Sequence, residues 1–138
     1  MYAVFLADGV TSRQNVDADD LPRRLAATEQ ARQILGIATN TFLGLPDNQL
    51  DSVPLIKVIQ PLEQVIRKIE PQVIYTHHYG DLNVDHSITS QAVMTACRPA
   101  PNASVKDIYA FEVMSSTEWG SVGLLPFCRI CLLIFLAT

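Results

Sequence analysis

Short β-type segments alternate with helix-like segments along this chain, and this order constrains its fold more than any other feature. The β-type segments are Tyr2–Ala7, Ile37–Leu43, Gln72–Thr76 and Lys106–Met114. The first is a nearly continuous apolar run that ends in a turn, as in strands buried on both faces. Strands that alternate with helices predict βαβ units with right-handed crossovers. The expected fold is α/β and Rossmann-like, with a mostly parallel sheet flanked by helices.

The helical segments lie between these strands. Pro22–Gly36 has Pro in its first turn and Gly at its stop, so both ends of a helix are indicated. Val53–Ile69 carries apolar residues at intervals of three and four and predicts a second helix. Pro61 lies inside it, so we expect a kink or a break into two helices near Gln60. Ser87–Ala96 predicts a third helix.

Bulk composition indicates a single soluble domain. The 138 residues are 49% hydrophobic and 17% charged with a net charge of -4, so no basic surface for nucleic acid is expected. The N-terminus lacks the pattern of a signal peptide. The apolar run Gly123–Ala137 is interrupted by Pro126 and Arg129 and is too short for a membrane span. We therefore expect no transmembrane segment.

The cysteines point to a reducing, cytoplasmic setting. Cys97, Cys128 and Cys131 are odd in number and lack the spacing of a disulfide framework. Cys128 and Cys131 form a C-x-x-C without a second pair, so incidental thiols are favoured over a metal or redox role.

Polar chemistry is concentrated in one loop that follows the third β-type segment. All three histidines of the chain, His77, His78 and His86, lie there with Asp81 and Asp85. Ligands bind at the carboxyl ends of parallel strands, and imidazole and carboxylate are ligands of catalytic zinc. Adjacent histidines at a strand end point to opposite faces, so one of His77 and His78 at most would face a metal held by His86.

The same loop has a reading without metal. Asp85 is a natural N-cap for the helix that follows, and loop histidines can simply be exposed. No G-x-G-x-x-G turn follows the first strand, so a dinucleotide site is disfavoured.

Several stretches of the chain resemble the LmbE-like or PIG-L-like metal-dependent de-N-acetylases. The signature Asp-x-Asn-x-Asp-His over residues 81–86 is the most specific of them. The others are Phe5–Ser12, Arg24–Ile37, Phe42–Asp47, Thr76–His78, Tyr109–Val113 and Ser115–Trp119. The resemblance implies an LmbE-like fold and a hydrolase that removes the acetyl group from an N-acetylated amino sugar or its conjugate.

The resemblance also implies roles for particular residues. The family holds one zinc ion per site, and His86 alone matches one of its ligands. The composition of the loop, not the resemblance, makes His77, His78 and Asp81 lesser metal candidates. Asn83 stands where many members have a histidine that stabilises the oxyanion, which an Asn amide could replace. Asp85 is expected to orient its neighbours in catalysis.

Arg24 and Asp47 match positions that reach into the substrate cleft of family members. They are therefore substrate-binding candidates. The alternative is a solvated helix face for Arg24 and a turn residue for Asp47.

The chain departs from the family pattern at both ends. The family's early His-Pro-Asp-Asp-Glu motif, with two metal ligands and the general base, should precede Tyr2, so the resemblance implies truncation at the N-terminus. We expect a partial deacetylase domain over residues 1–119 and an atypical apolar tail over 120–138. Loss of a central strand would expose apolar sheet edges, so a homo-oligomer is a further expectation.

Three hypotheses for function stay open. The first is a zinc-dependent de-N-acetylase, inactive or active as this chain. The second is a non-catalytic, Rossmann-like binding module without metal. The third is a zinc site formed within the loop from His77 or His78 together with Asp81 and His86.

Overall fold

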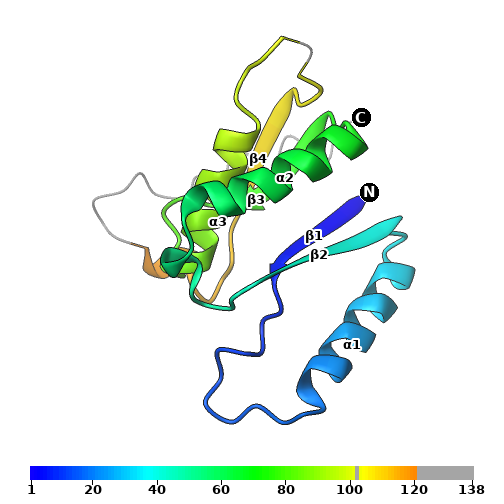
Figure 1. Cartoon of the computed structure of the whole chain (residues 1–138), viewed down its shortest axis with the longest axis vertical. Helices are drawn as coiled ribbons and strands as arrows, with labels where there is room; N and C mark the ends of the chain where they lie inside the picture. The colour runs from blue at the N-terminus through cyan, green and yellow to red at the C-terminus, as the bar shows by residue number, and fades with distance from the viewer. Residues whose placement is uncertain (102, 121–138) are drawn as a thin grey trace.

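The computed structural model describes residues 1–101 and 103–120. Strands and helices alternate along the chain (Figure 1). The elements are β1 (Tyr2–Ala7), α1 (Asp20–Ile34), β2 (Thr39–Leu45), the 3-10 turn η1 (Leu50–Ser52), α2 (Leu55–Ile69), β3 (Val73–His77), α3 (Val84–Ala96), β4 (Asp107–Phe111) and the 3-10 turn η2 (Thr117–Trp119). The predicted α/β class is confirmed. The expected apolar tail and the Cys128–Cys131 pair lie outside the described residues, apart from Gly120.

The second strand begins two residues later than expected, because the turn that closes α1 after Ile34 runs through Ile37. Gly36 has φ of 64°, a left-handed conformation that glycine adopts without steric cost. The Ile37 N–H then donates to the Arg32 carbonyl over 2.9 Å, and Arg32 Nη1 donates back to the Ile37 carbonyl over 2.9 Å. Ile37 therefore belongs to the helix end rather than to β2.

Helix α2 runs without interruption through Pro61, so of the two expected outcomes the break into two helices is wrong and the kink stays a prediction. Pro61 lacks an N–H and removes one hydrogen bond of the helix. The flanking residues Val58, Ile59 and Leu62 are buried and pack in the core. Burial of apolar side chains on both sides of the proline outweighs the loss of one hydrogen bond.

The strands pair as two parallel ribbons. β1 pairs with β2 in the register Tyr2↔Thr39, and β3 pairs with β4 in the register Val73↔Asp107. Among the described residues each sheet has two strands, β1-β2 and β3-β4. The expected parallel direction is thus confirmed, and the sheet is divided into two halves.

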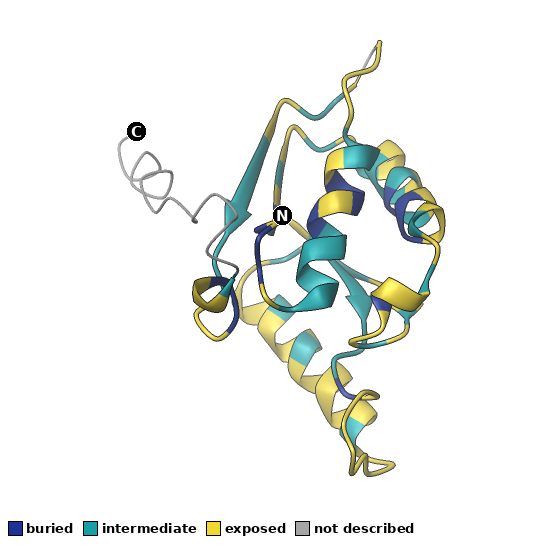
Figure 2. Ribbon diagram, turned by 90° about the vertical axis from the view of Figure 1, so that its left-hand side faces the viewer, coloured by how far each residue is buried: buried dark blue, intermediate teal, exposed yellow. Residues whose placement is uncertain are grey.

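A single helical layer covers one face of both halves. Its buried residues come from α2 and α3 and are Val58, Ile59, Leu62, Ala92 and Val93. Partly buried side chains of all four strands pack against them: Val4, Leu6, Leu43, Leu45, Ile74 and Ile108. Figure 2 shows this buried material concentrated in α2 and α3, whereas α1 is mostly exposed. The core therefore lies between the α2–α3 layer and the two sheets.

None of the helices within residues 1–101 and 103–120 combines the length and the apolar character needed to cross a membrane.

Candidate functional site

Hydrogen bonds bring the loops that follow β1, β2 and β3 to one edge of the molecule. After β1, the Ser12 hydroxyl donates to Asp47 Oδ2, which follows β2, over 2.6 Å. After β3, the Asp85 carboxylate accepts the N–H groups of Asn48 and Leu50 over 2.7 and 3.0 Å. The carboxyl ends of these three strands therefore meet, as expected of a parallel α/β fold.

The segment that follows β4 reaches the same edge. The Thr117 hydroxyl donates to Asp81 Oδ2 over 2.6 Å and accepts the N–H of Val113 over 2.7 Å. Polar residues from all four strand ends are thus joined.

Two histidine rings lie face to face at this edge. His77 ends β3, His86 lies in the first turn of α3, and their ring centroids are 3.9 Å apart with an interplanar angle of 3°. His77 Nδ1 is buried and has no hydrogen-bond partner among the described residues. Burial, then the proximity of His86, lowers the pKa of His77 to about 4, although Asp81 acts in the opposite direction. His77 is therefore neutral at pH 7.

Asp81 orients His86. Its side chain is fully buried, and Oδ1 lies 3.2 Å from His86 Nδ1. Burial acts to raise the pKa of Asp81, but hydrogen bonds donated by Thr117, Asn83, Ser116 and His86 hold it below its ordinary value. An ionised carboxylate only accepts, so in the neutral ring we infer that His86 Nδ1 carries the proton and that Nε2 keeps a lone pair for a ligand. Histidines that bind metals are commonly held by a carboxylate in this way.

The N-cap of α3 is Asn83, so the expectation that Asp85 caps this helix is wrong. Asn83 Oδ1 accepts the N–H groups of Asp85 and His86 over 2.9 and 3.4 Å. Asn83 adopts the extended conformation of an N-cap residue, and Val84 is the first helical residue. The Asp85 side chain is thereby free to reach Asn48 and Leu50. The Asn83 Nδ2 group can still act as a donor, so its oxyanion role stays a prediction.

A cleft of about 440 Å³ opens between the two sheets, and we call it the β1–β3 cleft. It brings together His77, His86, Asp85, Arg24 and Asp47. Its other lining residues are Tyr2–Ala7, Gly9, Leu50, Tyr75, Thr76, Thr89, Val93 and Phe111. Three of the residues singled out by the sequence, His78, Asp81 and Asn83, are not part of its lining.

Arg24 reaches this cleft by crossing the turn after β1. Its Nη2 would lie 3.2 Å from a Cβ built on Gly9, whose φ is 73°. Glycine at this turn thus permits both the left-handed backbone and the close approach of the guanidinium.

His78 directly follows β3 and, unlike His77, does not line the cleft. It is buried, its Nδ1 accepts the N–H of Gly80 over 3.2 Å, and its ring lies 4.6 Å from that of Tyr79. Within the part of the chain that the structure describes, no three His, Cys, Asp or Glu side chains are arranged to hold a metal ion. Asp81 is engaged by Thr117 and His86, and the zinc site expected from the loop alone stays a prediction.

Sequence reasoning assigned no role to Ser116 and Thr117. Thr117 binds Asp81, and Ser116 Oγ lies 3.4 Å from His86 Nδ1. The available signal was their position, since polar residues that follow a parallel strand lie at the ligand-binding edge.

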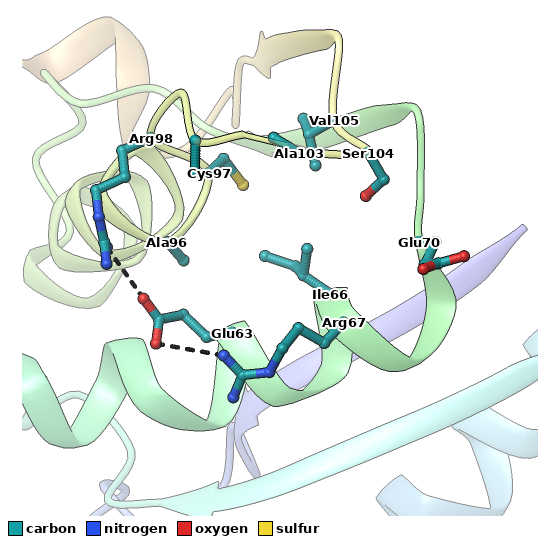
Figure 3. A pocket seen from close by; sticks show the side chains of 11 residues that line it. Glu63, Ile66, Arg67, Glu70, Ala96, Cys97, Arg98, Ala103, Ser104 and Val105 are labelled. Carbon is teal, nitrogen blue, oxygen red and sulfur yellow. Dashed lines mark hydrogen bonds and ion pairs between the residues drawn. The ribbon is translucent and has the colours of Figure 1, made fainter.

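A second hollow, of about 270 Å³, lies between the ends of α2 and α3 (Figure 3). Its cations share one carboxylate: Arg98 Nη1 lies 3.0 Å from Glu63 Oε1, and Arg67 Nη1 lies 4.0 Å from Glu63 Oε2. Burial raises the pKa of the Cys97 thiol, which lowers its reactivity. This hollow therefore lacks the catalytic groups found at the strand ends.

The fold and the strand-end geometry define a parallel α/β protein with a carboxylate-oriented histidine beside a cleft. The sequence model of the PIG-L family, described as GlcNAc-PI de-N-acetylase, matches residues 1–97. This match covers more than half of the 138 residues, and the chain belongs to this family. Comparison with curated protein sequences gives no significant match.

Two solved structures share the fold. A conserved protein from Thermus thermophilus is 22% identical with a TM-score of 0.61, over 76% of this chain and 49% of that chain. The N,N'-diacetylchitobiose deacetylase from Pyrococcus horikoshii, solved with its inhibitor, is 20% identical with a TM-score of 0.61, over 73% of this chain and 40% of that chain. The chain therefore spans about half the length of these proteins or less.

Proposed function

We propose that this chain carries the His86 part of a zinc-dependent de-N-acetylase that acts on an N-acetylated amino sugar or its conjugate. The observation that carries the proposal is the pairing of His86 Nδ1 with the buried Asp81 carboxylate, which leaves Nε2 for a metal. Membership of the PIG-L family supports this reaction, and the family's substrates give the class of sugar. One neighbour of the same fold is described as a deacetylase of an acetylated disaccharide.

The residues of this chain fit one ligand position of such a site. His86 would hold zinc through Nε2, and Asp81 would keep its ring in the required tautomer and orientation. When bound, zinc polarises the amide carbonyl of the acetyl group and lowers the pKa of a coordinated water. The same ligand chemistry accepts Fe²⁺ or Co²⁺, so metal identity is part of the test.

Other residues would act on the substrate. Asn83 Nδ2 is proposed to donate a hydrogen bond to the developing oxyanion. Arg24 and Asp47 line the β1–β3 cleft and are proposed to contact sugar hydroxyl or phosphate groups. Asp85 is proposed to position Asp47 by holding the adjacent N–H of Asn48. The products would be acetate and a free amine. We also propose that the protein acts in the cytoplasm.

The test is metal-dependent release of acetate from N-acetylglucosamine conjugates and from N,N'-diacetylchitobiose. We expect His86→Ala to abolish both zinc binding by this chain and any acetate release, whereas His78→Asn, which keeps an acceptor for the Gly80 N–H, should leave both at the wild-type level. Acetate release that survives His86→Ala would overturn the assignment of His86. Comparison of zinc, Fe²⁺ and Co²⁺ then identifies the metal that supports the reaction.

A second candidate is a non-catalytic binding module without metal. It is favoured by the absence of three converging metal donors among residues 1–101 and 103–120. Binding of an N-acetylated sugar that is unaffected by zinc or by His86→Ala, with no acetate released, would support this alternative.

A further inference from the structure

The segment that follows β4 closes on itself in a tight turn over residues 113–117, which we call the β4 turn. The N–H groups of Ser116 and Thr117 both donate to the Val113 carbonyl, over 2.9 and 2.8 Å. The Thr117 hydroxyl accepts the N–H of Val113 over 2.7 Å. Three hydrogen bonds thus join the two ends of the β4 turn, and they fix the position of the Thr117 hydroxyl.

Backbone contacts hold the β4 turn against the loop that follows β3. The N–H of Leu82 donates to the Ser116 carbonyl over 3.3 Å. Gly120, directly after η2, lies so close to Gly80 that a Cβ at Gly120 would collide with the Gly80 carbonyl oxygen. The β4 turn therefore meets this loop through main-chain groups, before any side chain is considered.

The Thr117 hydroxyl fixes the Asp81 carboxylate. It donates to Asp81 Oδ2 over 2.6 Å, and both residues are buried, at 8% and 6% exposure. The other oxygen, Oδ1, accepts the N–H of Asn83 over 2.8 Å and lies 3.2 Å from His86 Nδ1. Each oxygen of Asp81 thus has its own partners. Rotation of the carboxylate would break hydrogen bonds in a buried environment, where lost partners are costly.

A second hydroxyl lies beside the same ring nitrogen. Ser116 Oγ is 3.4 Å from His86 Nδ1. A hydroxyl can donate or accept a hydrogen bond, whereas an ionised carboxylate only accepts. If Asp81 turned away, Ser116 could donate to a bare Nδ1, and the ring proton would then lie on Nε2. The position of Asp81 therefore decides between two tautomers of His86, of which only one leaves Nε2 open.

We propose that Thr117 is a positioning residue for His86. Its hydroxyl fixes Asp81, so the imidazole keeps its proton on Nδ1 and presents a bare Nε2. The use of that Nε2 for a metal rests on the proposed function, but the tautomer itself is set without metal or sugar. Loss of a group that orients a metal ligand typically weakens metal binding by roughly 10- to 100-fold. Because Thr117 acts through Asp81, we expect an effect of about tenfold, at the lower end of this range.

The experiment is ¹⁵N NMR of the imidazole nitrogens of the 138-residue chain at about pH 7.5, first without metal and then with increasing zinc. Thr117→Val replaces the hydroxyl by a methyl group. We expect it to move the His86 proton from Nδ1 toward Nε2 and to weaken zinc binding at His86 about tenfold. Thr117→Ser restores the hydroxyl and should restore both readouts.

Two control variants separate positioning from general destabilisation. Val58→Ala removes buried apolar atoms from α2 and should leave the His86 tautomer unchanged. Ser116→Ala removes the competing hydroxyl and should also leave the proton on Nδ1. A folded Thr117→Val with the proton still on Nδ1 would overturn the proposal, as would an equal shift of the tautomer in Val58→Ala.

Wild-type protein supplies a test that does not depend on the folding of Thr117→Val. The Thr117 hydroxyl proton should exchange slowly with water, because it is buried and bonded to Asp81. Fast exchange of this proton would overturn the proposal. A tautomer that follows Thr117 in a protein without zinc affinity would leave this inference standing and refute the proposed function. Zinc binding that is equal in wild type and Thr117→Val would do the reverse.

Discussion

The Asp85 carboxylate is expected to be a stabilising tie between the first turn of α3 and the loop after β2. It accepts the N–H of Leu50 over 3.0 Å and that of Asn48 over 2.7 Å. Leu50 is almost fully buried, at 1% exposure, whereas Asn48 lies in an exposed environment. Replacement of Asp85 by Ala therefore leaves one donor in a protected environment and one that water can reach.

The two bonds differ in what their loss costs. A buried donor left without a partner costs about 1 to 3 kcal/mol, and a hydrogen bond to a charged group contributes about 1.5 to 3 kcal/mol. Because water can replace the bond to Asn48, we expect Asp85→Ala to lower the free energy of unfolding by about 2 to 4 kcal/mol. Asp85→Asn keeps one carbonyl acceptor and should lose about half as much.

Urea unfolding followed by circular dichroism measures this change. With an m-value of about 2 kcal/mol/M, a loss of 3 kcal/mol lowers the midpoint by about 1.5 M. The matched control is Asp51→Ala, which removes an exposed carboxylate from the same loop and should stay within about 0.5 kcal/mol of the wild type. A midpoint for Asp85→Ala equal to that of Asp51→Ala would refute the tie and leave Asp85 available for a direct catalytic role.

Three further predictions concern the site and the core. Thr117→Val removes the hydroxyl that bridges Asp81 and the backbone N–H of Val113, so it should lower the free energy of unfolding in urea by about 2 kcal/mol. Thr117→Ser keeps the hydroxyl and should stay near the wild type, and equal losses in the two variants would refute the bridge. An NMR titration without metal should give His77 a pKa of about 4 rather than its ordinary 6.5. Because the unfolded chain takes up this proton first, the His77 contribution to the free energy of unfolding is complete above pH 6.5 and falls as the pH drops toward 4. A measured pKa near 6.5 would contradict the burial of His77. Val58→Ala, at a fully buried position of α2, should lower the free energy of unfolding by about 2 kcal/mol. Ile56→Ala, at a position 53% exposed, should lower it by less than half of that. Similar values for the two variants would place the core elsewhere.

The order of elements could be predicted from the sequence because each segment carries its own local signals. Gly36 stops α1, and the apolar spacing of α2 identifies a long amphipathic helix. The fate of Pro61 could not be predicted in the same way. It depends on how strongly the neighbouring side chains are buried, which the sequence does not state.

The candidate site was predictable as a place but not as a set of contacts. The concentration of histidines after β3 identified the strand end, yet Asp81 is held by Thr117, 36 residues away in sequence. Asn83 and Asp85 are both good N-caps, and the choice between them depends on where the helix begins. Contacts between distant loops follow from the parallel topology, so they emerge only when all four strands are placed.

The division of the sheet also lies beyond sequence reasoning of this kind. Apolar periodicity identifies strands, but it does not show which edges are paired. The structure assigns β1 to β2 and β3 to β4, with the cleft between them.

The central claim is that Asp81 holds His86 ready to bind a metal through Nε2. Long-range ¹H–¹⁵N NMR of the imidazole nitrogens, recorded near pH 7.5 with and without added zinc, tests it most directly. We predict a proton on His86 Nδ1, a bare Nε2 that shifts when zinc is added, and loss of the tautomer preference in Asp81→Asn. A proton on Nε2 in the metal-free protein, with no response of His86 to zinc, would contradict the account.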